Sequence, residues 1–225
     1  MLTFCFICLP WLVNVQATQL ADLAFGRAQV EQFMRDRPEV RSVLIKEVAL
    51  REHLERGFGS LETGFHVCWD NREPEVREAD YRQRYDEEPA RVRVSKKPFG
   101  SGSDKCVTLV IELEHSKNDI RSTANSRMAY FGQMSREDYA RSSTYLEFLS
   151  VQRARKFFQQ HPLPPSEAGS DYKWLLRVPT EFSDYLKSFS DSDSHNVNLL
   201  EDWRQEYDKL VSQRKYDPMK MIPTP

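Results

Sequence analysis

The chain has 225 residues, of which 40% are hydrophobic and 29% charged, and its formal net charge is −2. This balance excludes a disordered chain, and the net charge excludes a uniformly polybasic protein that coats nucleic acid. A chain of this length can bury roughly 70% of the surface that it exposes when unfolded. We therefore expect a single soluble α+β domain over residues 18–216.

The first 17 residues carry no charged side chain, and residues 4–13 form an apolar run. That run is shorter than the roughly 20 residues of a membrane-spanning helix, and residues 15–17 (Val-Gln-Ala) are typical of a signal-peptidase site. We expect residues 1–17 to be a removable signal peptide, so that the mature chain is secreted or enters the secretory pathway and has no transmembrane span. The alternative is an intracellular protein with an uncleaved N-terminus, because the segment lacks Lys and Arg.

Cleavage would leave Cys68 and Cys106 as the remaining cysteines. In an oxidising compartment they could form a disulfide, and two buried thiols are the equally weighted alternative.

The first half of the chain begins with two apolar stripes at helical spacing, separated by Arg37-Pro38. They predict an N-terminal helix pair, the second helix ending at Gly57 and Gly59. The first stripe contains Leu20, Leu23, Val30, Phe33 and Met34, and the second contains Val40, Val43, Leu44 and Val48.

Strand-forming residues then cluster at 63–69, 91–94 and 107–114. Residues 98–104 have the composition of a turn, which predicts a β-hairpin between the last two segments with Gly100-Ser101-Gly102-Ser103 at its flexible tip. We expect a small antiparallel sheet of three or four strands. Residues 72–89 are almost entirely charged, which indicates an exposed loop or a short surface helix.

The second half predicts a helical layer packed on one face of this sheet. Ser135 and Asp138 have the spacing of a capping box, which begins a helix that can run to about Gln160. We expect residues 162–171 to form a linker and residues 173–178 to form a strand or extended segment. Two amphipathic helices follow, from about residues 182 and 198, and residues 217–225 form a flexible tail.

One pair of carboxylates suggests a metal site for hydrolysis. In a strand at 107–114, Glu112 and Glu114 would share a face about 7 Å apart. With Asp70 from a neighbouring strand, three carboxylates could bind Mg²⁺ and activate a water molecule against a phosphodiester, with Lys117 beside them.

This arrangement resembles that of the restriction-endonuclease-like nucleases, over about a quarter of the chain. In that family an Asp on one strand precedes an acidic-x-acidic or acidic-x-Lys triplet on the next; the triplet here is Glu112-Leu113-Glu114 and ends in Glu where Lys is usual. The resemblance implies a metal-dependent nuclease with Asp70, Glu112 and Glu114 as metal ligands and Lys117 stabilising developing charge.

A structural explanation accounts for the same glutamates without a metal. If the hairpin pairs Arg93 with Glu112 and Arg91 with Glu114, both ion pairs lie on its outer face. Each exposed pair would contribute about 0.2–1 kcal/mol. We favour this explanation, under which no cofactor is expected.

Other motifs are weaker. The five histidines are scattered, and although His66 and Cys68 would share a strand face, one such pair is a poor indication of a metal or a nucleophile. Residues 117–160 mix Arg with Tyr and Phe, a combination that can bind single-stranded nucleic acid, but the helical spacing of these aromatics indicates a core.

Charge is distributed unevenly along the second half. Residues 117–160 carry eight Lys/Arg against four Asp/Glu, and residues 181–208 carry eight Asp/Glu against two Lys/Arg. These segments could meet inside the molecule, face different partners or be solvated helix faces.

We expect a non-catalytic interaction protein that binds another macromolecule, most simply a protein and secondarily a nucleic acid, through its helical layer or charged surface. The metal-dependent nuclease is the alternative. A carrier with a large apolar cavity is the third possibility.

Overall fold

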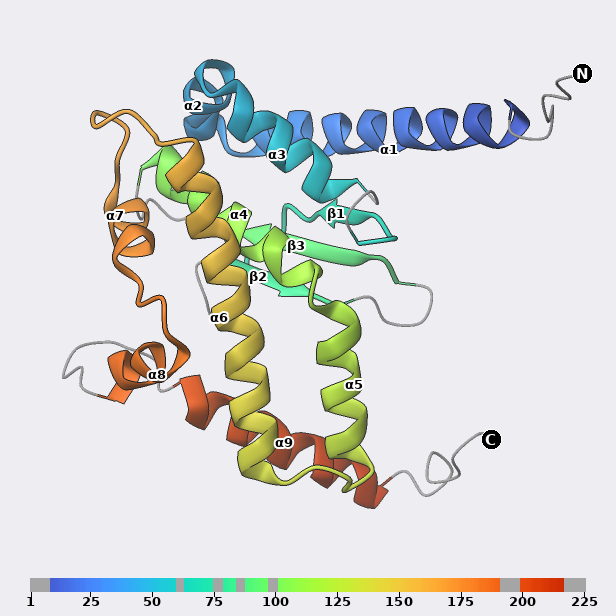
Figure 1. The fold of residues 1–225 in the computed structure, drawn as a ribbon, viewed down its shortest axis with the longest axis vertical. Coiled ribbons are helices and arrows are strands. Elements are labelled where there is room, and N and C mark those ends of the chain that lie inside the picture. The colour runs from blue at the N-terminus through green and yellow to red at the C-terminus, as the bar shows by residue number, and fades with distance from the viewer. Residues whose placement is uncertain are drawn as a thin grey trace, which may run out of the picture. The chain divides into compact units, whose positions relative to one another are not determined.

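The computed structural model describes residues 9–59, 63–74, 79–83, 88–96, 101–190 and 199–216. Nine α-helices and one three-stranded sheet occur in these ranges, which confirms the α+β class (Figure 1). The chain forms two compact units. The first contains residues up to Ser116 together with His161–Tyr172, and the second contains Lys117–Gln160 together with the residues from Lys173 onward.

The first unit begins with the predicted helix pair. Helix α1 (Leu9–Asp36) ends at the Arg37-Pro38 break, and the chain continues as the 3₁₀ helix η1 (Pro38–Val40), α2 (Arg41–Lys46) and α3 (Val48–Phe58). Proline at the first position of η1 lacks an N–H that the helix would leave unsatisfied in any case. Helix α3 packs against α1. The core includes Val30, Phe33 and Met34 of the first predicted stripe and Val40, Val43 and Leu44 of the second, whereas Leu20 and Val48 are exposed.

The sheet contains β1 (Val67–Trp69), β2 (Ala79–Arg82) and the central strand β3 (Ala90–Val94). Strand β2 is antiparallel to β3, but β1 is parallel to it, so the sheet is mixed where an antiparallel one was predicted. Strand β2 also corrects the prediction of a loop or surface helix over 72–89. It forms despite its charge because Asp80 lies opposite Arg93 and forms an ion pair with it.

The largest correction concerns residues 102–116, which form helix α4 (Gly102–Ser116). The predicted strand at 107–114 and its hairpin with 91–94 are therefore wrong, as is the assignment of Gly102 and Ser103 to a hairpin tip. Residues 97–100 lie outside the described ranges. Helix α4 packs against β2 and β3, and its buried side chains lie on nearly every side of the helix.

The chain returns to the first unit at 161–172. Asp104 accepts hydrogen bonds there from the backbone N–H groups of Asp171 (2.9 Å) and Ser170 (3.3 Å). These bonds cap helix α7 (Ser170–Arg177), which corrects the prediction of an extended segment at 173–178.

The second unit contains α5 (Asp119–Tyr130), α6 (Arg136–Gln160), α8 (Phe182–Ser190) and α9 (Leu199–Tyr216). Helix α6 confirms the prediction from the capping box, since the Ser135 hydroxyl accepts the Asp138 N–H at 3.1 Å. Helix α9 packs against α5 and α6.

The basic and acidic segments of the second half meet within this unit. Arg136 of α6 bonds to Asp208 of α9 at 2.9 Å, and Arg204 of α9 bonds to Glu137 of α6 at 2.8 Å. Bonding to Asp208 raises the pKa of Arg136, and bonding to Arg204 lowers the pKa of Glu137. Part of the charge asymmetry therefore serves an intramolecular contact.

Cys68 lies on β1 and the buried Cys106 on α4, and the two thiols are not bonded to each other. Within the described ranges, no helix combines the length and the apolar character that a bilayer crossing requires. Residues 1–8 and 217–225, which include part of the predicted signal peptide and the whole predicted tail, lie outside those ranges.

Candidate functional site

The structure separates the two glutamates of the predicted metal site. They lie on α4, where residues two apart point in nearly opposite directions because successive residues are rotated by about 100°. Glu112 contacts His115 at 3.0 Å on the same helix, whereas Glu114, only 2% exposed, contacts His53 of α3 at 3.3 Å. Each carboxylate thus has its own histidine.

Asp70 follows β1 and has a different basic partner. Both of its carboxylate oxygens accept hydrogen bonds from the Arg72 guanidinium, at 2.6 to 3.0 Å. These bonds lower the pKa of Asp70 and keep it ionised. Arg93, the predicted partner of Glu112, bonds to Asp80 instead.

These partners leave no shared metal site in the described part of the chain. No three His, Cys, Asp or Glu side chains there are arranged to hold an ion. Asp70, Glu112 and Glu114 belong to the first unit, and Lys117 is the first residue of the second. The carboxylates of an acidic-x-acidic triplet share a face only in a strand, where side chains alternate between two faces. Residues 112–114 are helical, so Glu112 and Glu114 do not converge.

The His66 and Cys68 pair also has a structural role. His66 Nε2 lies 2.8 Å from Asp22 Oδ1, and the Phe25 ring stacks on the imidazole at a centroid distance of 4.0 Å. Burial raises the pKa of the Cys68 thiol, which opposes formation of the nucleophilic thiolate. His66 thus attaches the residue before β1 to α1, and the raised pKa of Cys68 argues against an activated nucleophile.

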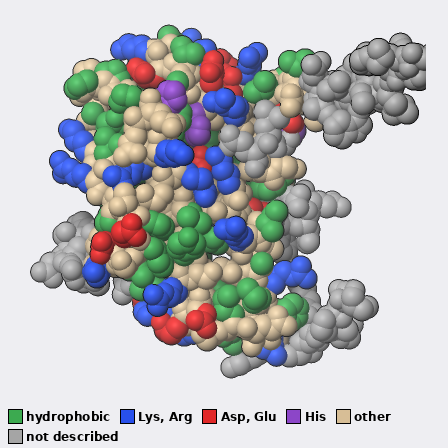
Figure 2. All heavy atoms as spheres, in the orientation of Figure 1, with side chains coloured by type: hydrophobic (Ala, Val, Ile, Leu, Met, Phe, Trp, Pro, Cys, Tyr) green, Lys and Arg blue, Asp and Glu red, His purple; other side chains and the backbone are tan. Residues whose placement is uncertain are grey.

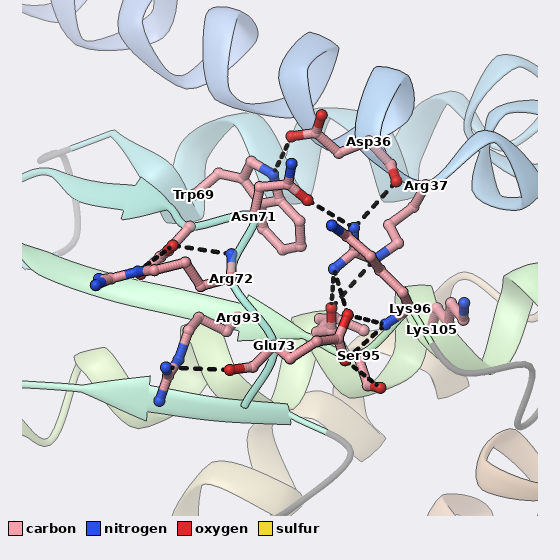
Figure 3. Close-up of polar contacts among 12 residues, drawn as sticks. Asp36, Arg37, Trp69, Asn71, Arg72, Glu73, Arg93, Ser95, Lys96 and Lys105 are labelled. Carbon is pink, nitrogen blue, oxygen red and sulfur yellow. Dashed lines mark hydrogen bonds and ion pairs between the residues drawn. The ribbon is translucent and has the colours of Figure 1, made fainter. Parts of the chain in front are cut away.

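Arg37 lies within a buried polar cluster of the first unit (Figure 3). Its side chain is 1% exposed. It donates to the Val94 carbonyl from Nε and Nη2 and to Asn71 Oδ1 from Nη1, and it lies over the Trp69 ring. Because its donors are directed at the protein's own acceptors, the cluster joins the end of α1 to β3 and to the loop after β1.

The second unit presents a surface of another kind on α7 and α6. Leu175 and Val178 are buried, whereas Lys173, Trp174 and Arg177 are exposed. The exposed residues are spaced i, i+1 and i+4, so they share the outer face of α7. Trp174 retains 47% of its accessible surface, which is high for so large an apolar side chain.

Helix α6 bonds to the residues that follow α7 and adds positive charge. Arg155 Nη1 donates to the Val178 carbonyl at 2.9 Å, and Gln152 Nε2 donates to the Pro179 carbonyl at 2.8 Å. Lys156 is exposed and lies on the same side of α6, four residues after Gln152. The two hydrogen bonds hold residues 178 and 179, directly after α7, against the part of α6 that contains Lys156.

We call Lys156, Lys173, Trp174 and Arg177 the α6–α7 basic face. Figure 2 shows Lys and Arg side chains gathered over α7 and the adjoining part of α6. The nearest acidic residues along the chain are Asp171, which is half-buried two positions before Lys173 and accepts a hydrogen bond from Thr108, and the exposed Glu181, four positions after Arg177. Two cations therefore flank the exposed ring of Trp174 on α7, and Lys156 adds a third on α6, in a protein whose net charge is −2.

Sequence reasoning missed this face because residues 173–178 were interpreted as extended. The helical spacing of Lys173 and Arg177 on either side of a tryptophan was the available signal.

Comparison with known proteins gives no match: no family model, no curated protein and no solved structure matches the chain.

Proposed function

We propose that the chain is a non-catalytic binding protein that holds an anionic macromolecule on the α6–α7 basic face. The observation that carries this proposal is the outer face of α7, where Lys173 and Arg177 are exposed beside the half-exposed ring of Trp174. Tryptophan and arginine are enriched among the residues that contribute most to binding energy. Lys156, positioned by the bonds between α6 and the end of α7, extends the face.

The electrostatics support a localised contact. With a net charge of −2, the molecule as a whole does not attract polyanions, so attraction requires a local cationic surface such as this face. By contrast, the carboxylates of the nuclease alternative have separate basic partners and do not converge. A binding surface is thus the function that the geometry supports best.

Retention on immobilised heparin, a polyanion, tests the proposal. The parent protein should bind at low salt and elute in a salt gradient, whereas the triple variant K156E/K173E/R177E should flow through. The matched control is R35E/R41E/R127E, which reverses three cations that are exposed elsewhere and changes the net charge by the same −6. Flow-through of the parent, or equal loss of retention in the control, would contradict the proposal.

We also propose that the protein enters the secretory pathway after removal of residues 1–17. Cleavage after Ala17 would preserve the part of α1 that packs in the core, including Val30 and Phe33. N-terminal sequencing of the exported protein should begin at Thr18. Recovery of the full-length chain in the cytosol would contradict this proposal.

A further inference from the structure

We infer that the anionic partner of the α6–α7 basic face is a single-stranded nucleic acid, with one base stacked on Trp174 and its phosphates held by Lys156, Lys173 and Arg177. This inference rests on the proposed function and narrows it to one class of ligand. It comes from the combination of an exposed aromatic ring with cations on its own helix and on the adjoining one.

The apolar content of the face distinguishes nucleic acid from other anionic partners. Among the large apolar side chains of α7, Tyr172 and Leu175 are buried and Trp174 is exposed. Leu176 is half-buried and, two residues after Trp174, lies on another side of the helix. A stable protein interface buries a central apolar cluster, and a membrane-bound amphipathic helix inserts a broad apolar face. One ring is too little for either partner, but one ring is what a single base needs for stacking.

The exposure of Trp174 also distinguishes single strands from duplexes. In a duplex the bases are stacked on one another, and their faces are closed to a protein side chain. A single strand presents free base faces, which aromatic rings bind with little sequence preference. Arg177 lies three residues from Trp174, and Lys173 lies next to it on the same face of the helix. Both are placed to contact the backbone on either side of the stacked base.

The charges set the expected salt dependence. Neutralising phosphates of a single strand gives a slope of about −0.7 per contact in a plot of log affinity against log salt. Three contacts predict a slope near −2, which is a loss of about 20-fold between 50 and 200 mM salt. Each cation removed should reduce that slope by about 0.7.

The test measures binding of the full chain to a fluorescein-labelled 12-nucleotide thymidine strand by anisotropy, at several salt concentrations. Trp174→Ala should weaken binding about 5- to 150-fold without changing the salt slope, because the ring contributes stacking and no charge. Trp174→Phe should recover most of the affinity. Lys173→Gln should reduce the slope.

The control for Trp174→Ala is Tyr145→Ala, which removes an exposed aromatic side chain of α6 outside the basic face. This control should bind the strand like the parent. Circular dichroism of every variant separates loss of binding from loss of fold.

Two further probes make the outcomes decisive. A 12-base-pair duplex should bind more weakly than the strand and should be indifferent to Trp174→Ala. Equal binding of strand and duplex with no effect of Trp174, or binding of poly-glutamate or anionic vesicles in preference to the strand, overturns the inference. In those cases heparin retention would still support the proposed function, whereas loss of heparin retention as well overturns both.

Discussion

The carboxylate of Asp104 in α4 accepts the backbone N–H of Asp171, in the first turn of α7, at 2.9 Å. The same side chain accepts the N–H of Ser101 at 3.0 Å, so one buried carboxylate caps two helices that are distant in sequence. A Cβ atom at Gly169 would lie 2.1 Å from both Asp104 oxygens, which explains a glycine at that position. This double cap fixes the start of the helix that carries the α6–α7 basic face.

Asp104→Ala should lower the free energy of unfolding by about 3 kcal/mol. The substitution leaves the N–H groups of Ser101, Ser170 and Asp171, at two helix starts, without their acceptor. Urea denaturation followed by circular dichroism measures the loss. Asp184→Ala, which removes an exposed carboxylate paired with Lys187 in α8, is the matched control and should cost less than about 0.5 kcal/mol. Equal losses in the two variants would show that the double cap contributes nothing particular.

Asp171→Asn should make the protein more stable at neutral pH. Burial, followed by the neighbouring charge of Asp104, raises the pKa of Asp171. A carboxyl group whose pKa is raised in the folded state stabilises the fold when the pH is below its unfolded-state pKa. This stabilisation is lost as the pH rises through its folded-state pKa. The asparagine variant removes that loss and still accepts the hydrogen bond from Thr108.

The melting temperature of the parent and of Asp171→Asn, followed from pH 3 to pH 8, checks this sign. The difference in melting temperature should grow in favour of the variant as the pH rises. Comparing the two proteins cancels Asp70 and Glu73, whose lowered pKa values have the opposite effect on stability. A difference that is constant with pH, or that favours the parent near pH 7, would refute the assignment.

The parts of the fold that could be predicted from sequence are those with one buried face. Helix α6 begins at the Ser135 and Asp138 cap, and α8 and α9 carry apolar stripes on one side, so periodicity identified them. Strands β1 and β3 were recognisable from β-branched and aromatic residues. In these elements the secondary structure that the local sequence favours is also the one that buries its apolar residues.

Helix α4 could not be recognised in this way because its buried side chains lie on nearly every side. Val107, Thr108, Val110 and Ile111 favour strands, and a helix buried all round shows no amphipathic period. Its cap was nevertheless present in the sequence: Ser101 and Asp104 have the same spacing as Ser135 and Asp138. In both pairs the Asp N–H donates to the Ser hydroxyl, and the hydroxyl donates to the Asp carboxylate.

The wrong prediction of a strand at 107–114 led to the predicted site at Glu112 and Glu114. Once residues 107–114 are helical, Glu112 and Glu114 no longer share a face. The basic face was hidden for a related reason, because α7 is eight residues long and its cap comes from Asp104, about 65 residues earlier in the chain. When a residue distant in the sequence caps a helix, the residues near the helix contain no pattern that predicts where the helix starts.

Arg37→Lys should destabilise the protein by about 2 kcal/mol, although it keeps the charge. The planar guanidinium donates to Val94 and Asn71 at the same time from a buried position, which a single ammonium cannot reproduce. Thermal or urea unfolding measures the effect. Arg35→Lys, an exposed substitution two residues earlier, is the control and should be nearly neutral. A neutral result at Arg37 would mean that its forked hydrogen bonds add little to the join between α1 and β3.

Gly26→Ala separates helix propensity from packing in α1. Alanine favours an exposed helix position over glycine by about 1 kcal/mol, so propensity alone predicts stabilisation. A Cβ atom at Gly26, however, would lie 1.8 Å from the Glu55 carbonyl oxygen of α3, a contact that requires the two helices to separate. We expect packing to outweigh propensity and the variant to lose more than about 2 kcal/mol in urea denaturation. Ala28→Gly, at an exposed position of the same helix, measures the propensity contribution alone and should cost about 1 kcal/mol. If Gly26→Ala were instead stabilising, α1 and α3 could not be as closely packed as the structure places them.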